Sequence, residues 1–462
     1  MESAHHPPAP CLGALFLLAM SACDFNSTRD PLHRFEAATT ELPDIVLITL
    51  DTTRADHLGA YGYPRATSPA FDRLAAESLL FENFVVPMAT TLPVHLSLFT
   101  GLEPEEHGVL ANKDFQNRRF VPPANAHTLA STLGAQGYDT AAFVSAAPVK
   151  KHTGLEKGFA RFGQPQESER RAKKTTDRAL TWLSDKAEPP YLLWVHYYDP
   201  HDPYRPPREQ RKALDVDDSL RSWAEERGLD EPHLVPLARY DAEILSMDEQ
   251  LGRLVDSLRR AGRWENTIVV VAGDHGEGLG QHGVERHGLV WSEQTHAPLL
   301  IRASDIEPDR HPGMVTASDI VPTLLGMVDL PDEVDLLAQT SGQDVLADGD
   351  PRQAVLSRSS LRRSDRVGDA HKTFPDTWAL TTPEWTLHWT RKGPTALYDL
   401  DDDPYERSSV LDEHPELAQD LWHSGTWWLK SQRERGKQLG AGKLEAMDPE
   451  LVRQLEELGY VE

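Results

Sequence analysis

The stretch IVLITL, at Ile45–Leu50, is apolar along its length and is followed at once by Asp51. A continuous apolar run is typical of a strand that is covered on both faces of its sheet. Four similar runs follow it, at Ala141–Val144, Tyr191–Val195, Ile268–Ala272 and Pro298–Ile301. Long helical patterns lie between them, chiefly at Arg171–Asp185 and Ala238–Arg260. Strands that alternate with helices predict an α/β fold, with a large mixed, mostly parallel sheet sandwiched by helices.

The pattern loosens after about residue 330, where polar stretches interrupt it. Short alternating runs occupy Trp378–Asp399, and a helical, tryptophan-containing tail follows them. We therefore predict a large α/β domain over residues 43–330 and a smaller C-terminal α+β subdomain over residues 331–462. A chain of 462 residues is long enough for this division.

The composition excludes several functions. The chain has 47 Lys and Arg against 73 Asp and Glu, which gives a net charge of −26. This balance argues against a nucleic-acid partner, because phosphate contacts require concentrated Lys and Arg. The only cysteines are Cys11 and Cys23, so the body of the chain has no disulfide framework, Cys-ligated zinc or catalytic thiol.

The amino terminus has the features of an export signal. The apolar run Cys11–Met20 is too short to span a bilayer but fits the core of a signal peptide over residues 1–22. Met20–Cys23 resembles the lipobox of bacterial lipoproteins, which implies lipid attachment at Cys23 and a tether over residues 23–42. The alternative is an ordinary cleaved signal peptide. We expect export to the bacterial cell envelope, with membrane contact through the lipid anchor only.

Chemically reactive side chains follow the predicted strands. Asp51 follows the first strand, Asp274 and His275 follow another, and His201 lies just past a third. Ligands of open α/β sheets collect at the carboxyl ends of the strands, so these side chains can meet at one edge. Each alone also fits a helix cap or a structural histidine. Together, carboxylate oxygens and imidazole are a plausible first shell for a divalent metal ion.

The segment TLPVHLSLFTG, at Thr91–Gly101, adds a hydroxyl group. Pro93 suits the first turn of a helix, which places Thr91 at the helix entrance, where the dipole favours an anion. Thr91 fits a simple N-cap. Beside a metal ion it also fits a nucleophile that attacks a phosphoryl or sulfuryl group. His95 lies four residues on and shares the helix face of Thr91.

These segments together resemble the sulfatase family of the alkaline phosphatase superfamily, from about Asp44 to Leu411. The resemblance is carried by LITLDTTRADHLGAYGY, TLPVHLSLFTG, HYYDPHDPY and GDHGEGLGQHG, which occur in the order of the family. It implies an alkaline phosphatase-like fold and ester hydrolysis. It makes Asp51, Asp274 and His275 metal ligands and puts Thr91 at the nucleophile position, where we expect its hydroxyl to bind the metal as well. It also implies that His201 contacts the ester or protonates the leaving oxygen, with His287 as a partner in a loop that contains two histidines.

The sequence departs from the sulfatase pattern at the reacting position. Sulfatases oxidise a Cys or Ser to formylglycine, whereas Thr91 would give a ketone, so we expect no formylglycine. His95 replaces the usual Arg, Thr52 replaces the second Asp of the first metal pair, and Ala141–Lys151 stands where a Lys-x-His segment is usual. The site residues resemble instead the pattern of lipoteichoic acid synthase-like and phosphoethanolamine transferases, which has one Asp, a Thr and an Asp-His pair. Those enzymes accept a phosphoryl group on a metal-bound threonine.

Three interpretations follow, and the first is favoured. The protein is a metal-dependent hydrolase of phosphoric esters that uses unmodified Thr91, a true sulfate ester hydrolase, or a catalytically inactive surface-tethered binding protein. The substrate is expected to be a small-molecule, glycan or lipid ester. One divalent ion is expected: calcium is usual for sulfatases, whereas His275 favours zinc or manganese.

Overall fold

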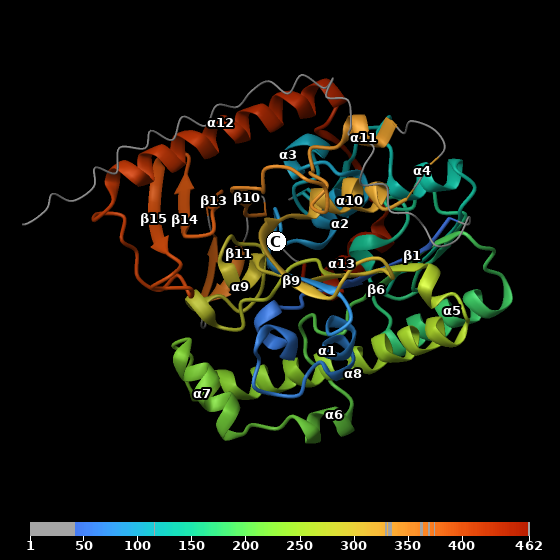
Figure 1. Cartoon of the computed structure of the whole chain (residues 1–462). Coiled ribbons are helices and arrows are strands. Elements are labelled where there is room, and N and C mark those ends of the chain that lie inside the picture. The colour runs from blue at the N-terminus through green and yellow to red at the C-terminus, as the bar shows by residue number, and fades with distance from the viewer. Residues whose placement is uncertain are drawn as a thin grey trace, which may run out of the picture. The chain divides into compact units, whose positions relative to one another are not determined.

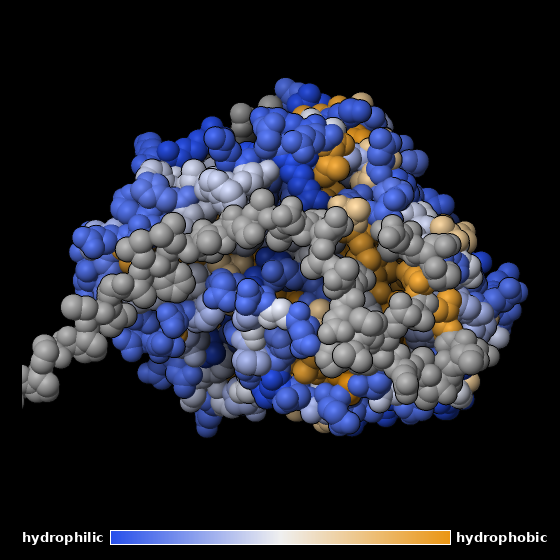
Figure 2. Space-filling view, turned by 45° about the horizontal axis from the view of Figure 1, so that its top comes forward, coloured by the Kyte–Doolittle hydropathy of each residue, from blue (hydrophilic) through white to orange (hydrophobic). Residues whose placement is uncertain are grey.

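The computed structural model of the chain describes residues 42–114, 116–328, 330, 335–360, 364–367, 370–373 and 375–460. The predicted signal peptide and the lipid site at Cys23 lie outside the described residues. None of the helices described combines the length and the apolar character that crossing a membrane requires. Hydrophilic residues cover most of the face seen in Figure 2. Among the large apolar side chains described, Val235 and Trp427 are exposed.

The central sheet has eight strands in the order β5-β4-β6-β1-β7-β8-β2-β9. Its strands are β1 (Asp44–Leu50), β2 (Leu79–Phe84), β4 (Asp139–Phe143), β5 (Arg161–Gly163), β6 (Tyr191–Tyr197), β7 (Thr267–Gly273), β8 (Leu299–Arg302) and β9 (Asp309–Val315). Only β8 pairs antiparallel with its neighbours, β7 and β2, and the other pairs are parallel. The predicted mixed, mostly parallel sheet is confirmed.

Strand β1 lies in the middle of the sheet and is buried on both faces. Its side chains alternate between two apolar cores, so Leu47 belongs to one core and Ile48 to the other. The first core contains residues of α2 (Thr91–Thr100), α4 (Leu129–Ala135) and α10 (Ile320–Gly326). The second contains residues of α1 (Pro69–Ala75), α5 (Ala172–Asp185), α7 (Asp218–Glu226) and α8 (Glu231–Arg260). Burial on both faces explains why this strand is apolar throughout.

A second, antiparallel sheet follows in the order β10-β13-β14-β15. Its strands are β10 (Val355–Arg358), β13 (Trp378–Thr381), β14 (Trp385–Thr390) and β15 (Gly393–Asp399). The long helix α12 (Pro415–Leu439) covers this sheet (Figure 1). Trp378, Trp389 and Leu429 belong to the core between them. The predicted C-terminal α+β subdomain is thus present.

The chain then returns to the larger domain. Strand β16 (Lys443–Ala446) pairs with β3 (Arg118–Val121), and α13 (Pro449–Glu457) packs against the turn Ala147–Val149. The remaining elements are α3 (Pro104–His107), α6 (Arg208–Ala213), α9 (Ser292–Thr295), α11 (Asp335–Gln339), β11 (Ser364–Val367) and β12 (Ala370–Thr373). All described residues belong to one compact unit. The division at residue 330 stays a prediction.

The buried histidine of α3 makes stability depend on pH. His107 Nδ1 accepts a hydrogen bond from the Val109 amide at 3.1 Å, and Nε2 lies 3.3 Å from Ser97 Oγ. Burial lowers the pKa of His107 to about 3. Below its ordinary pKa the unfolded chain takes up a proton that the folded chain does not, so stability falls as the pH drops from 6.5 toward 3.

We predict that His107→Gln loses less stability on acidification than the natural chain does. Between about pH 7.5 and about pH 5 the difference should be roughly 2 kcal/mol, measured by urea unfolding. The exposed residue His423 provides the control, because His423→Gln should behave like the natural chain. Equal losses in His107→Gln and the natural chain would show that this histidine does not carry the effect.

Candidate active site and metal centre

Two carboxylates meet where neighbouring parallel strands end. In the register of β1 and β7, Leu50 lies opposite Gly273, so Asp51 and Asp274 follow side by side. The Asp274 amide donates to the Leu50 carbonyl at 3.2 Å, and the Thr52 amide donates to Asp274 Oδ1 at 3.0 Å. Ligand atoms of Asp51, Asp274 and His275 lie within 4.8 Å of one another, and all three residues are buried.

These residues fit a divalent cation. Asp51 Oδ1 and Asp274 Oδ2 are buried without a hydrogen-bond partner. Burial raises the pKa of both carboxyls well above the ordinary value, and the negative charge of Asp51 adds to the effect at Asp274. His275 Nδ1 donates to the Gly276 carbonyl at 2.9 Å, which leaves the Nε2 lone pair 3.5 Å from Asp274 Oδ2. A cation would pair with both orphaned oxygens and with this nitrogen.

Thr91 faces this cluster and does not cap its helix. The N-cap position of α2 belongs to Thr90, and Thr91 is the first helical residue. Thr91 Oγ1 lies 3.4 Å from His275 Nε2, and the Asp51 carboxylate is its neighbour in the cluster. The N-cap interpretation of Thr91 is therefore wrong. Its hydroxyl lies at a helix N-terminus beside the cluster, where an anion is favoured.

His95 is held beneath Thr91. Trp194 Nε1 donates to Thr49 Oγ1 at 3.0 Å, so the Thr49 hydroxyl is free to donate to His95 Nε2, also at 3.0 Å. His95 Nδ1 then donates to the Thr91 carbonyl at 2.8 Å. Burial lowers the pKa of His95 well below its ordinary value, so the ring is neutral. Both nitrogens are used inside the protein, and a direct chemical role for His95 stays a prediction.

His201 and His287 form a pair above the cluster. Their Nε2 atoms lie 3.3 Å apart. His201 Nδ1 lies 2.6 Å from the Asp202 carbonyl and His287 Nδ1 lies 2.9 Å from the Ala89 carbonyl, so both Nδ1 atoms carry a proton. The contact between the Nε2 atoms is then favourable when one of the rings holds a second proton. The other histidine of that loop, His282, bonds to Glu293 and is not part of the pair.

The structure adds His196, which the sequence analysis missed. His196 lies on β6 opposite Thr49 of β1. Its Nδ1 accepts from the Ser145 amide at 3.2 Å, so Nε2 donates to Asp51 Oδ2, also at 3.2 Å. Burial lowers its pKa to about 3. A signal was available, because His196 directly follows the apolar run Tyr191–Val195.

Tyr460 is the second residue that was missed, and it comes from the other end of the chain. Its hydroxyl lies 3.4 Å from Thr91 Oγ1 and 3.1 Å from His201 Nε2. Burial raises its pKa above the ordinary value, so the hydroxyl keeps its proton. No local pattern could reveal this contact, because 369 positions separate Tyr460 from Thr91.

At two positions the sequence departs from the sulfatase pattern, and neither position supplies the usual lysine or aspartate side chain to the site. Lys150, in the segment that stands in place of Lys-x-His, bonds to Gln454 Oε1 at 2.5 Å, and burial lowers its pKa to about 8. It therefore serves the packing of α13. Thr52 has a left-handed backbone (φ 48°) and contributes its amide, rather than a carboxylate, to Asp274.

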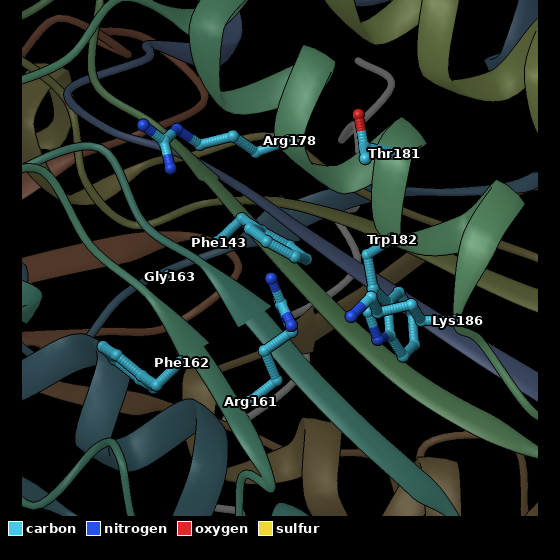
Figure 3. Close-up of a pocket in the computed structure, with 8 residues that line it drawn as sticks. All are labelled: Phe143, Arg161, Phe162, Gly163, Arg178, Thr181, Trp182 and Lys186. Atoms are coloured by element: carbon cyan, nitrogen blue, oxygen red, sulfur yellow. The ribbon is translucent and has the colours of Figure 1, made fainter.

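Neither of two cavities in the described part of the chain is lined by Asp51, Thr91, Asp274 or His275. A cavity of about 310 Å³ lies between α5 and the β4–β5 edge, and Figure 3 shows Arg161, Arg178 and Lys186 around its aromatic floor. None of the site residues lines it. A second cavity, of about 30 Å³, reaches His201 beside Tyr198. Thr91 itself is 0 % exposed.

Comparison with known proteins identifies the family. The profile of the sulfatase family matches residues 43–330, more than half of the chain, so the chain belongs to the sulfatase family and is a sulfatase-like ester hydrolase. An ulvan-active sulfatase of Formosa agariphila is 26% identical over 415 residues, which cover 80% of this chain and 77% of that protein.

Solved structures share the fold. A Bacteroides thetaiotaomicron protein, described in connection with the metabolism of multiple glycosaminoglycans, superposes with a TM-score of 0.71 at 21% identity, covering 90% of this chain and 99% of its own. The phosphonate monoester hydrolase of Agrobacterium radiobacter superposes with a TM-score of 0.66 at 18% identity, covering 85% of this chain and 96% of its own. The predicted alkaline phosphatase-like fold is confirmed.

We predict that the cluster binds Mn²⁺ or Zn²⁺ more tightly than Ca²⁺, since His275 supplies imidazole. His196→Phe should weaken the affinity roughly 10- to 100-fold, because Asp51 loses the donor that orients it. Asp274→Asn should abolish binding. Isothermal titration with each metal measures these affinities.

The exposed His423→Phe is the control for the metal titration and should bind as the natural chain does. An unchanged affinity in His196→Phe would contradict the orienting role of this histidine.

Proposed function

We propose that the protein is a metal-dependent hydrolase of phosphoric esters in which unmodified Thr91 is the nucleophile. The observation that carries the proposal is the position of Thr91 Oγ1, which lies 3.4 Å from His275 Nε2 in the cluster where Asp51 and Asp274 each have one carboxylate oxygen without a hydrogen-bond partner. Cysteine cannot supply a formylglycine here, because both cysteines lie in the first 23 residues.

Asp51, Asp274, His275 and Thr91 would hold the divalent ion. When bound, it would polarise the non-bridging oxygens of the ester and favour the ionised form of the hydroxyl. The N-terminus of α2 would stabilise negative charge on the phosphoryl group.

The first step forms a bond between Thr91 Oγ1 and phosphorus and breaks the bond to the leaving oxygen. The hydroxyl proton passes to the neighbouring Asp51 carboxylate, which has one oxygen without a hydrogen-bond partner. The His201–His287 pair donates its shared proton to the leaving alkoxide.

The second step is hydrolysis of the phosphothreonine. Water attacks phosphorus and gives a proton to the His201–His287 pair. Thr91 leaves as its alkoxide and recovers its proton from Asp51, and phosphate is released. The enzyme therefore returns to its starting state, with one ester bond hydrolysed per cycle.

Sulfate esters are the second candidate substrate. The ulvan-active sulfatase supports this alternative, because its name specifies sulfate chemistry. The phosphonate monoester hydrolase supports the phosphorus alternative, because it has the same fold and its name specifies phosphorus esters. The Thr91 hydroxyl favours phosphorus, since it lacks the aldehyde that sulfatases use.

We predict that Thr91→Ala lowers metal-dependent turnover by about 10³-fold or more, because it removes the attacking oxygen. Thr91→Ser keeps a hydroxyl and should stay within about tenfold of the natural chain. The assay compares aryl phosphate, phosphodiester, phosphonate ester and aryl sulfate.

Thr90→Ala is the matched control for this assay, because it removes the neighbouring hydroxyl that bonds to Ser360. Undiminished turnover in Thr91→Ala would exclude the nucleophile. A preference for aryl sulfate would select the sulfate alternative, and absence of both metal binding and turnover would select a binding protein.

We further propose that Cys23 carries a lipid that tethers the enzyme to the cell envelope. The proposal rests on the lipobox-like segment Met20–Cys23. Labelling of cells with a fatty acid should mark the natural chain and Cys11→Ala, whereas Cys23→Ala should be unlabelled. Equal labelling of Cys23→Ala would exclude the anchor.

A further inference from the structure

The last described residues, here called the C-terminal strap (Met447–Tyr460), lie over the catalytic edge of the sheet. Leu455 and Leu458 are buried in an apolar cluster with Ala146 and Ala147 of the larger domain. Lys150 adds a hydrogen bond to Gln454 at 2.5 Å. The strap is therefore held against the larger domain by a small apolar cluster and a hydrogen bond.

The end of the strap turns into the site. Gly459 has a φ of +84°, and a Cβ there would lie 2.4 Å from Arg286 Nη1, so glycine permits the turn. Arg286 Nη1 donates to the Gly459 carbonyl at 2.8 Å, and Arg286 Nη2 pairs with Asp202, next to His201. Tyr460 is thereby held at the end of the strap.

The hydroxyl of Tyr460 occupies the position that an ester needs. It lies 3.4 Å from Thr91 Oγ1 and 3.1 Å from His201 Nε2, and thus between the attacking oxygen and the acid. Thr91 is 0 % exposed. The small cavity that reaches His201 is not lined by Thr91. An ester cannot reach Thr91 in this arrangement.

We propose that Tyr460 is the gate of the active site: the strap moves it aside to admit the ester and returns its hydroxyl to the reacting group. This inference rests on the proposed function, because it takes Thr91 as the nucleophile. The closed gate excludes water from the cluster, and the hydroxyl donates a hydrogen bond to the ester or to the leaving oxygen.

The test separates the ring of Tyr460 from its hydroxyl. Tyr460→Ala removes the gate, so the loaded full-length chain should release Mn²⁺ to a chelator about tenfold faster than the natural chain does. Tyr460→Phe keeps the ring and should release Mn²⁺ at the natural rate. Its kcat on the preferred ester should fall about tenfold with KM unchanged, because the hydrogen bond to the reacting group is lost.

The control is Glu456→Gln, which changes an exposed residue in the helix α13 of the strap and should match the natural chain in both assays. Natural rates of Mn²⁺ release and natural kinetics in Tyr460→Ala would overturn the gate. Failure of the proposed function is distinguishable, because it appears as full turnover in Thr91→Ala, whereas Mn²⁺ release requires no turnover.

Discussion

The structure depends on two carboxylates that are buried at the ends of adjacent parallel strands. Asp51 and Asp274 are held side by side by the β1–β7 register, and each keeps one oxygen without a partner. Burial raises the pKa of both carboxyls well above the ordinary value, and the negative charge of Asp51 adds to the effect at Asp274. A divalent cation would remove this penalty. The residues at this edge of the sheet therefore fit a ligand set that a bound cation would complete.

Two neutral histidines, His196 and His95, orient Asp51 and Thr91 by hydrogen bonds. His196 donates to Asp51, and His95 donates to the Thr91 carbonyl through a chain that begins at Trp194. Each ring has a defined tautomer because its other nitrogen accepts from a group that donates. Neither ring adds positive charge, so the ion alone would balance the carboxylates. The histidines thus orient the site residues, whereas the carboxylates supply the charge of the site.

Much of this arrangement could be predicted from the sequence, because it depends on local patterns. The apolar run at Ile45–Leu50 predicted a buried strand. The position of Asp51 and of the Asp274–His275 pair directly after predicted strands identified them as site residues. Tyr460 could not be predicted, because its contact depends on how the last helix folds back. His196 directly follows an apolar run, as Asp51 does, but a lone histidine at such a position is usually structural, so this signal was not specific. Lys150 illustrates the reverse case, since it serves packing and does not face the cluster.

Family membership leaves open whether the protein acts on sulfur or on phosphorus, and the proposed role of Thr91 as nucleophile favours phosphorus. A hydroxyl that carries no aldehyde must itself bond to the transferred group, so the covalent intermediate distinguishes the proposed chemistry from that of formylglycine. The most direct measurement is mass spectrometry of the metal-loaded enzyme, acid-quenched during turnover of a phosphodiester and digested. The account predicts a phosphoryl or phosphodiester adduct on Thr91, and an unmodified Thr91 between turnovers. An adduct on another residue, or an oxidised Thr91 in the resting enzyme, would contradict it.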